Sequence, residues 1–308
     1  MQSLDEAKGV YIISVTPFTD AGALDLQSTD RLVDFYLESG VTGITVLGMM
    51  GEAPKLTADE SRTFTRHVLR RIGERVPVVV GVSSPGFAAM GALAESVMGD
   101  GAAGVMVAPP GTVRTDTQIL DYFSGVAETL GAIPWVLQDF PLATGVQIAP
   151  SVIASLIHAI PTCLMLKHED WPGLNKITTL RQSMAKGDVR RISILVGNGG
   201  VFLPEELARG ADGAMTGFAY PEMMVEVCRL FAAGASERAS DLFDAYLPLA
   251  RYEQQPGAGL AVRKHVLAKR GIIASSALRK PGKALADLEI GEVGRLIERQ
   301  VRRLAEIG

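Results

Sequence analysis

The chain has 308 residues, of which 47% are hydrophobic and 21% are charged, and 30 basic and 34 acidic side chains give a net charge of −4. This length and apolar content suffice for a large buried core, and the mixed charges offer no basic patch for nucleic acid or an anionic membrane surface. The sequence contains no secretory signal pattern and no apolar stretch of the roughly 18 residues that span a bilayer. We therefore expect a cytoplasmic protein that acts on a small molecule.

The two cysteines, Cys163 and Cys228, both lie in apolar surroundings. Such cysteines are typical of proteins from a reducing compartment, so we expect free thiols and no disulfide. The cysteines and histidines do not follow a metal-ligand spacing, and we expect no bound metal.

Eight short apolar runs alternate with longer helical stretches, which is typical of βαβ units. The runs are hydrophobic throughout, which indicates burial on both faces of a parallel sheet. The predicted strands are Val10–Val15, Gly43–Leu47, Val76–Val80, Gly104–Val107, Pro134–Leu137, Cys163–Lys167, Ile192–Val196 and Gly213–Thr216. We predict an α/β fold, a (β/α)8 TIM barrel. A doubly wound sheet is the alternative, but the first strand is not followed by a glycine-rich phosphate-binding turn.

Helix ends in the sequence support the same architecture. Residues 57–60 form a capping box, and Thr115 and Pro150 begin two further helices. Three similar turns each place a glycine between a helix and the next strand, and these glycines are Gly40, Gly101 and Gly210. Repetition of one turn indicates one repeated unit.

The strand pattern ends at about Ala235. Beyond it the sequence predicts amphipathic helices at Ser236–Arg251, Gly257–Gly271 and Glu289–Glu306. We expect a catalytic barrel over residues 1–235 and a helical extension over residues 236–308. The apolar faces of these helices must pack on the barrel or on another subunit, which predicts an oligomer.

Lys167 ends an apolar run that otherwise has the features of a buried strand. Active sites of barrel enzymes lie at the C-terminal ends of the strands, and partial desolvation there favours the neutral amine that attacks a carbonyl. The position predicts a lysine that forms a Schiff base. A lysine that merely extends from a strand end to solvent is the alternative.

Glu169 follows two residues later, so the period of two along a strand places it on the same side as Lys167 and turns His168 away. Glu169 is a candidate general acid or base beside the imine. Its alternative role is an ion pair that orients Lys167 or a nearby arginine. We expect His168 to be a packing or surface residue.

The segment Gly48-Met49-Met50-Gly51-Glu52 follows the second predicted strand. Its backbone N–H groups are suited to binding a carboxylate in a small nest. The alternative is a tight glycine turn whose methionines fill the mouth of the barrel.

Several motifs occur together and in a characteristic order. They are Thr16-Pro17-Phe18, the Gly48-Met49-Met50-Gly51-Glu52 loop in place of Gly-Thr-Thr-Gly-Glu, Phe140-Pro141 with Thr144-Gly145, and Lys167. Over nearly its whole length the chain resembles the dihydrodipicolinate synthase and N-acetylneuraminate lyase family of class I aldolases. The resemblance implies a barrel, a 2-keto acid held as a covalent imine on Lys167 without another cofactor, and usually a homotetramer.

The chain departs from the synthases and lyases of that family at residues that move protons. Gln138 replaces a tyrosine, and Met49 and Met50 replace two threonines. The segment 108–111 lacks the second tyrosine of the synthases, and Ala143 stands where they have an arginine for a second carboxylate. These differences argue against the synthase reaction.

The chain is more similar to the 2-keto-3-deoxy-sugar-acid dehydratases, in particular 2-keto-3-deoxy-L-arabonate dehydratase. The matching positions are Gln138-Asp139, Glu169, Pro109-Pro110 and Gly213-Ala214-Met215-Thr216-Gly217. This resemblance implies that Lys167, Glu169 and Gln138 are catalytic. The residues expected to bind substrate are Thr16, Gly48, Met49, Met50, Asn198, Met215 and Thr216.

We therefore predict a dehydratase, a carbon–oxygen lyase, that acts on a 2-keto-3-deoxy sugar acid. A pyruvate-dependent aldolase or a synthase-type condensation is the enzymatic alternative. A second alternative is a catalytically silent barrel with a binding or regulatory role.

Overall fold

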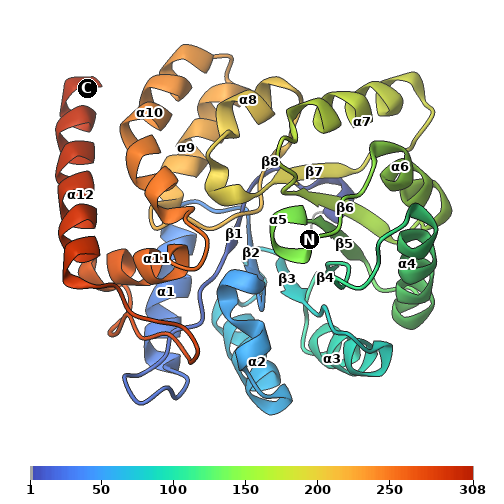
Figure 1. The fold of residues 1–308 in the computed structure, drawn as a ribbon, viewed down its shortest axis with the longest axis horizontal. Helices are drawn as coiled ribbons and strands as arrows, with labels where there is room; N and C mark the ends of the chain where they lie inside the picture. The colour runs from blue at the N-terminus through green and yellow to red at the C-terminus, as the bar shows by residue number, and fades with distance from the viewer. Residues whose placement is uncertain (1–2, 308) are drawn as a thin grey trace.

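A computed structural model describes residues 3–307 and shows a closed barrel of eight parallel strands surrounded by helices (Figure 1). Each strand pairs with the next in the chain, and β1 pairs with β8 through Gly9 and Gly213 to close the barrel. The strands are β1 Gly9–Ile13, β2 Gly43–Val46, β3 Val78–Gly81, β4 Gly104–Val107, β5 Trp135–Asp139, β6 Cys163–His168, β7 Ser193–Val196 and β8 Gly213–Ala214. The predicted barrel is confirmed, and the doubly wound alternative is wrong.

The predicted strand ends differ from the observed ones by at most two residues, and Gly104–Val107 is the same in both. The third strand begins at Val78 and not at Val76, because Pro77 has no N–H group for the ladder, although its carbonyl accepts from Ile44 N at 3.0 Å. The fifth strand extends to Asp139, two residues beyond its predicted end. This extension places Gln138 in the barrel wall.

The helices between the strands begin and end largely as predicted. They are α1 Leu26–Glu38, α2 Ala58–Ile72, α3 Phe87–Gly99, α4 Asp116–Leu130, α5 Pro141–Thr144, α6 Pro150–Ala159, α7 Leu174–Lys186, α8 Leu203–Ala208 and α9 Pro221–Ala232. Thr57 and Thr115 each form a capping box with the residue three positions on. Within residues 3–307, no helix has the length and apolar content needed to cross a membrane.

Two layers of buried side chains hold the barrel together. The interior contains large apolar side chains such as Tyr11, Met106, Met165 and Met215, and the second layer lies between the strands and the outer helices. Both cysteines are free, and burial raises the pKa of the Cys163 thiol to about 12. The barrel is thus a packed core, so a site can form only at its ends.

Three further helices follow the barrel: α10 Ser236–Glu253, α11 Gly259–Lys269 and α12 Asp287–Ile307. Helix α10 packs on α9, and α12 packs on α10 at the outside of the molecule (Figure 1). Their presence after residue 235 agrees with the sequence, and the division into two domains there stays a prediction.

A buried ion pair ties these helices to the barrel. Arg263 Nε donates to Glu253 Oε1 at 2.6 Å, and Arg263 Nη2 donates to the carbonyl of Gly217 at 2.6 Å, just after β8. Burial raises the pKa of Glu253, and the guanidinium opposes that rise. The pair fixes the end of α10 against the C-terminal face of the barrel.

Candidate active site

Lys167 lies at the C-terminal end of β6, with only 4% of its surface exposed. Its Nζ atom lies 2.8 Å from Oε2 of Glu169, which is 5% exposed. The strand continues through His168, and the N–H of Glu169 still donates to the carbonyl of Asp139 at 2.8 Å. The extended backbone therefore brings the two side chains together, as the period of two predicts.

Two side-chain amides donate hydrogen bonds to Glu169, and a neighbouring glycine leaves room for its side chain. Gln138 lies beside Lys167 in the register of β5 with β6, and its Nε2 donates to Glu169 Oε2 at 2.7 Å. Asn198 Nδ2, from the loop after β7, donates to the backbone carbonyl of Glu169 at 3.0 Å. A Cβ atom on Gly197 would lie 2.2 Å from Glu169 Cγ, so this glycine leaves room for the glutamate. The side-chain amides of Gln138, predicted to be catalytic, and of Asn198, predicted to bind substrate, thus both donate to Glu169.

His168 points to the other side of the strand, as predicted, and is a fully buried packing residue. Its Nε2 lies 3.1 Å from the carbonyl of Gly173, and its Nδ1 lies 3.7 Å from Asp139 Oδ2. Lys176 Nζ contacts Asp139 at 2.8 Å and Asp170 at 2.7 Å. This cluster, which the sequence does not reveal, fixes the ends of β5 and β6 behind the site.

The loop after β2 is a short helical turn, Met49–Gly51, between two residues with unusual backbone conformation. Leu47 and Glu52 have φ values of 54° and 58°, which non-glycine residues rarely adopt. Thr16 Oγ1 donates to the carbonyl of Gly51 at 2.6 Å. Thr16 therefore fixes the loop and does not line the cavity described below.

Glu52 is buried and connects this loop to the C-terminal helices. Its Oε1 lies 2.6 Å from Lys264 Nζ on α11, and its Oε2 lies 2.8 Å from Lys55 Nζ. Burial lowers the pKa of Lys264, and the carboxylate of Glu52 opposes that change. The ion pairs hold the left-handed backbone of Glu52 in place.

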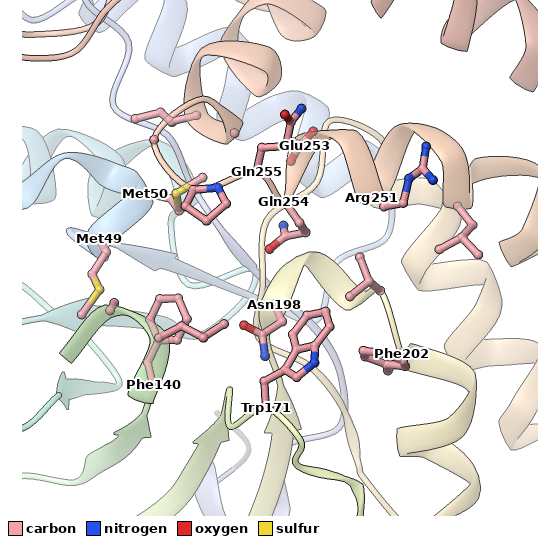
Figure 2. A pocket seen from close by; sticks show the side chains of 18 residues that line it. Met49, Met50, Phe140, Trp171, Asn198, Phe202, Arg251, Glu253, Gln254 and Gln255 are labelled. Carbon is pink, nitrogen blue, oxygen red and sulfur yellow. The ribbon is translucent and has the colours of Figure 1, made fainter. Parts of the chain in front are cut away.

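A cavity of about 840 Å³ lies at the C-terminal face of the barrel (Figure 2). Met49 and Phe140 lie on one side of it and Phe202 on the other, with Trp171 and Asn198 between them. Lys167 and Glu169 do not form its wall, and Asn198 connects them to it through its hydrogen bond to Glu169.

The structure distributes the predicted substrate-binding residues between the cavity and its support. Met49, Met50 and Asn198 lie on the cavity wall. Met215 is fully buried in the barrel interior, and Thr216 Oγ1 accepts from Gly199 N at 2.8 Å. Gly48 precedes the helical turn and does not line the cavity. The sequence does not reveal the contributions of Trp171, Phe202 and residues 247–260, since no spacing relates them to Lys167.

A second cavity, of about 390 Å³, lies beside the first and shares Asn198, Trp171 and Phe202 with it. Glu206, on α8, lines this cavity and is 6% exposed, and its Oε2 has no hydrogen-bond partner among the described residues. Burial raises the pKa of Glu206 to about 8, with smaller contributions from the charges of Glu205 and Glu169. The raised pKa favours the neutral form of Glu206, and the charge of Glu169 contributes to it.

Comparison with known proteins identifies a family for this chain. Residues 6–300 match the model of the dihydrodipicolinate synthetase family. The chain is 31% identical to L-2-keto-3-deoxyarabonate dehydratase of Azospirillum brasilense, over 89% of this chain and 88% of that protein. It is 30% identical to 4-hydroxy-tetrahydrodipicolinate synthase of Persephonella marina, over 79% and 81%.

Comparison with solved structures identifies the same family. The crystal structure of dihydrodipicolinate synthase from Rhodopseudomonas palustris superposes with a TM-score of 0.95 at 53% identity, over 97% of this chain and 99% of that one. The match covers the barrel and the C-terminal helices alike. The chain belongs to the dihydrodipicolinate synthetase family.

Proposed function

We propose that the protein is a Schiff-base-forming carbon–oxygen lyase, a dehydratase that removes water from a 2-keto-3-deoxy sugar acid. The observation that carries the proposal is the contact of 2.8 Å between Lys167 Nζ and Glu169 Oε2, two side chains that are both buried. The imine itself activates the substrate, so the proposed reaction uses no further cofactor.

The proposed reaction begins with attack of the Lys167 amine on the C2 carbonyl and loss of water to form the imine. C3 is bonded to the imine carbon, so a carboxylate that contacts Nζ also reaches a proton on C3. Glu169 removes this proton to give an enamine, and the C4 hydroxyl leaves as water with a proton returned by the same carboxyl group. Hydrolysis of the imine then releases the product.

The surroundings of Glu169 favour dehydration over the synthase reaction. Gln138 cannot transfer a proton as a tyrosine does, but its amide holds the Glu169 carboxylate at 2.7 Å. Ala143 supplies no charge for a second substrate carboxylate. Similarity to a dehydratase from Azospirillum brasilense supports the same choice, whereas similarity to synthases keeps aldol chemistry as the alternative.

Product analysis distinguishes the two reactions. Incubation with 2-keto-3-deoxy sugar acids should yield a deoxygenated keto acid without pyruvate. Stoichiometric pyruvate together with an aldehyde would instead establish aldol cleavage.

Borohydride trapping tests whether the barrel is catalytic at all. In the presence of pyruvate, reduction should fix a mass adduct on the peptide that contains Lys167. The matched control is Lys167→Arg, which keeps a positive charge beside Glu169 but forms no imine. Absence of an adduct in folded wild-type protein at saturating pyruvate would favour the silent barrel.

We also propose that the protein forms a homotetramer in the cytoplasm, where free thiols such as Cys163 and Cys228 persist. The outer helix α12 offers apolar side chains for subunit contacts, such as Val301 at 60% exposure. Light scattering at micromolar concentration should give the mass of four chains, and a monomer would refute the assembly.

A further inference from the structure

Glu206 is a buried carboxyl group without a counter-ion on the wall of the second cavity. It is 6% exposed and lines the cavity of about 390 Å³ between the loops after β6 and β7. Among the described residues, its side chain has no hydrogen-bond or ion-pair partner. A buried polar group without a partner costs free energy, which indicates that the missing partner comes from outside the chain.

Arg209 is the cationic side chain on the wall of this cavity, and it does not neutralise Glu206. Its guanidinium is turned to α7, where Nη1 donates to Asn175 Oδ1 and to Thr178 Oγ1, each at 3.0 Å. Residues at this spacing on a helix can form an ion pair, but within residues 3–307 Glu206 and Arg209 do not. The charge of Arg209 therefore leaves the carboxyl group unpaired.

Asp170 supplies a second carboxylate to the same wall. Its Oδ2 lies 2.7 Å from Lys176 Nζ, and this lysine also contacts Asp139 Oδ2 at 2.8 Å. Two carboxylates thus share one lysine, which leaves no positive charge for Glu206. The start of α7 at Leu174 also lines the cavity and favours an anion, and Asp170 already provides one. The charges on this wall therefore favour a positively charged ligand.

Two aromatic rings lie on the same wall as Glu206. Trp171 and Phe202 line both cavities (Figure 2), and their ring centroids lie 5.0 Å apart with an interplanar angle of 77°. Trp171 is 45% exposed, so part of its ring remains free for a ligand. The face of an aromatic ring attracts a cation, most strongly in tryptophan. An unpaired carboxyl group beside such rings matches the chemistry of an organic ammonium ion.

We propose that the second cavity binds a small organic ammonium ion, with its charged nitrogen at the carboxylate of Glu206 and its apolar part against Trp171 and Phe202. A volume of about 390 Å³ is at the lower end for ligand pockets, which limits the ligand to a small amine. Lys167 does not line this cavity, so the site is separate from the proposed imine chemistry.

The ionisation of Glu206 gives this site a measurable signature. Burial raises the pKa of Glu206 to about 8, and the charges of Glu205 and Glu169 act in the same direction. The other charged groups on the cavity wall are Asp170 and Arg209. An ammonium ion beside the carboxyl group favours its ionised form and lowers its pKa. Below about pH 8, binding of the cation therefore releases a proton, and the affinity rises with pH up to that value.

The experiment is isothermal titration calorimetry at pH 7 with benzylamine, and with benzyl alcohol and phenylacetate as probes of similar shape. We expect benzylamine to bind at least about tenfold more tightly than either of the other two. It should also release close to one proton, measured from the dependence of the heat on the ionisation enthalpy of the buffer. Equal binding of benzyl alcohol would overturn the proposal, because the charge would then contribute nothing. Tighter binding of phenylacetate, or no binding of benzylamine at millimolar concentration, would overturn it as well.

Substitutions test whether Glu206 and Trp171 form the site. Glu206→Gln keeps the shape of the side chain and should weaken benzylamine binding by at least about tenfold and abolish the proton release. The matched control is Glu205→Gln, which removes an exposed carboxylate and should retain most of both. Trp171→Leu should weaken binding by about two- to fivefold, the usual range for an exposed cation–π contact. Unchanged affinity and proton release in Glu206→Gln would place the ligand elsewhere and refute the assignment.

Discussion

Replacement of Glu206 by glutamine should stabilise the protein increasingly as the pH rises. The pKa of this carboxyl is raised from its ordinary value of 4.5 to about 8 by burial. Between these two values the unfolded chain has released the proton while the folded protein still binds it. Unfolding then releases a proton, so a higher pH favours the unfolded state. The destabilisation begins near pH 4.5 and is complete above about pH 8.

The magnitude follows from the difference of about 3.5 pH units between 4.5 and 8. At about 1.4 kcal/mol per unit, ionisation of Glu206 lowers the free energy of unfolding by up to roughly 5 kcal/mol. Glutamine is neutral at every pH and has nearly the same shape. Glu206→Gln should therefore match the wild type near pH 4.5 and exceed it by about 3–5 kcal/mol near pH 8.5.

The assay is urea unfolding followed by far-ultraviolet circular dichroism at pH 5, 7 and 8.5, with the protein concentration held constant. The matched control is Glu205→Gln, which removes an exposed carboxylate from the preceding position. This control should retain most of the pH dependence of the wild type. Parallel stability curves for Glu206→Gln and the wild type would show that Glu206 is already ionised in the folded protein, and the reasoning would be wrong.

Three further predictions concern the active site and its support. Glu169→Gln should still form the borohydride adduct but lose turnover by about 10²-fold or more, and near-normal turnover would assign Glu169 a structural role. Gly197→Ala should lower kcat by about 10²-fold, because the new Cβ would lie 2.2 Å from the glutamate side chain; Gly294→Ala, which has open space around it, should not. Arg263→Met should reduce the free energy of unfolding by about 3–5 kcal/mol, since it leaves Glu253 buried without its partner; a urea titration that gives less than about 1 kcal/mol would contradict this.

The barrel was predictable because its strands are short apolar runs separated by recognisable helix ends. The predicted strand ends are wrong where the apolar pattern and the hydrogen-bond ladder of the sheet end at different residues. Gln138 and Asp139 are polar, so hydrophobicity alone ends β5 before them, yet they continue the ladder with Lys167 and His168. Active sites of barrels lie at the C-terminal ends of the strands, so residues there are often polar. Such residues lack the apolar pattern by which a strand is predicted.

The contact between Lys167 and Glu169 was predictable for a similar reason, since the two residues are two positions apart at the end of one strand. The hydrogen bonds that hold Glu169 were not predictable, because Gln138 lies on β5 and Asn198 in the loop after β7, and no spacing in the sequence connects them. Glu206 has the sequence context of a surface residue, and only the packing of α8 buries it. The cavity wall likewise depends on loops that barrel closure brings together.

The mouth of the barrel is formed by segments that are distant from one another in the sequence. Met50, in the loop after β2, lines the same cavity as residues 254–260, and the buried contact between Glu52 and Lys264 joins the two segments. A chimera that exchanges only the last 70 or so residues with a relative would therefore separate two halves of one wall. In such hybrids the ligand preference should depend on both segments together. Recombination between members of this family, natural or in the laboratory, must therefore exchange both segments to transfer a ligand preference.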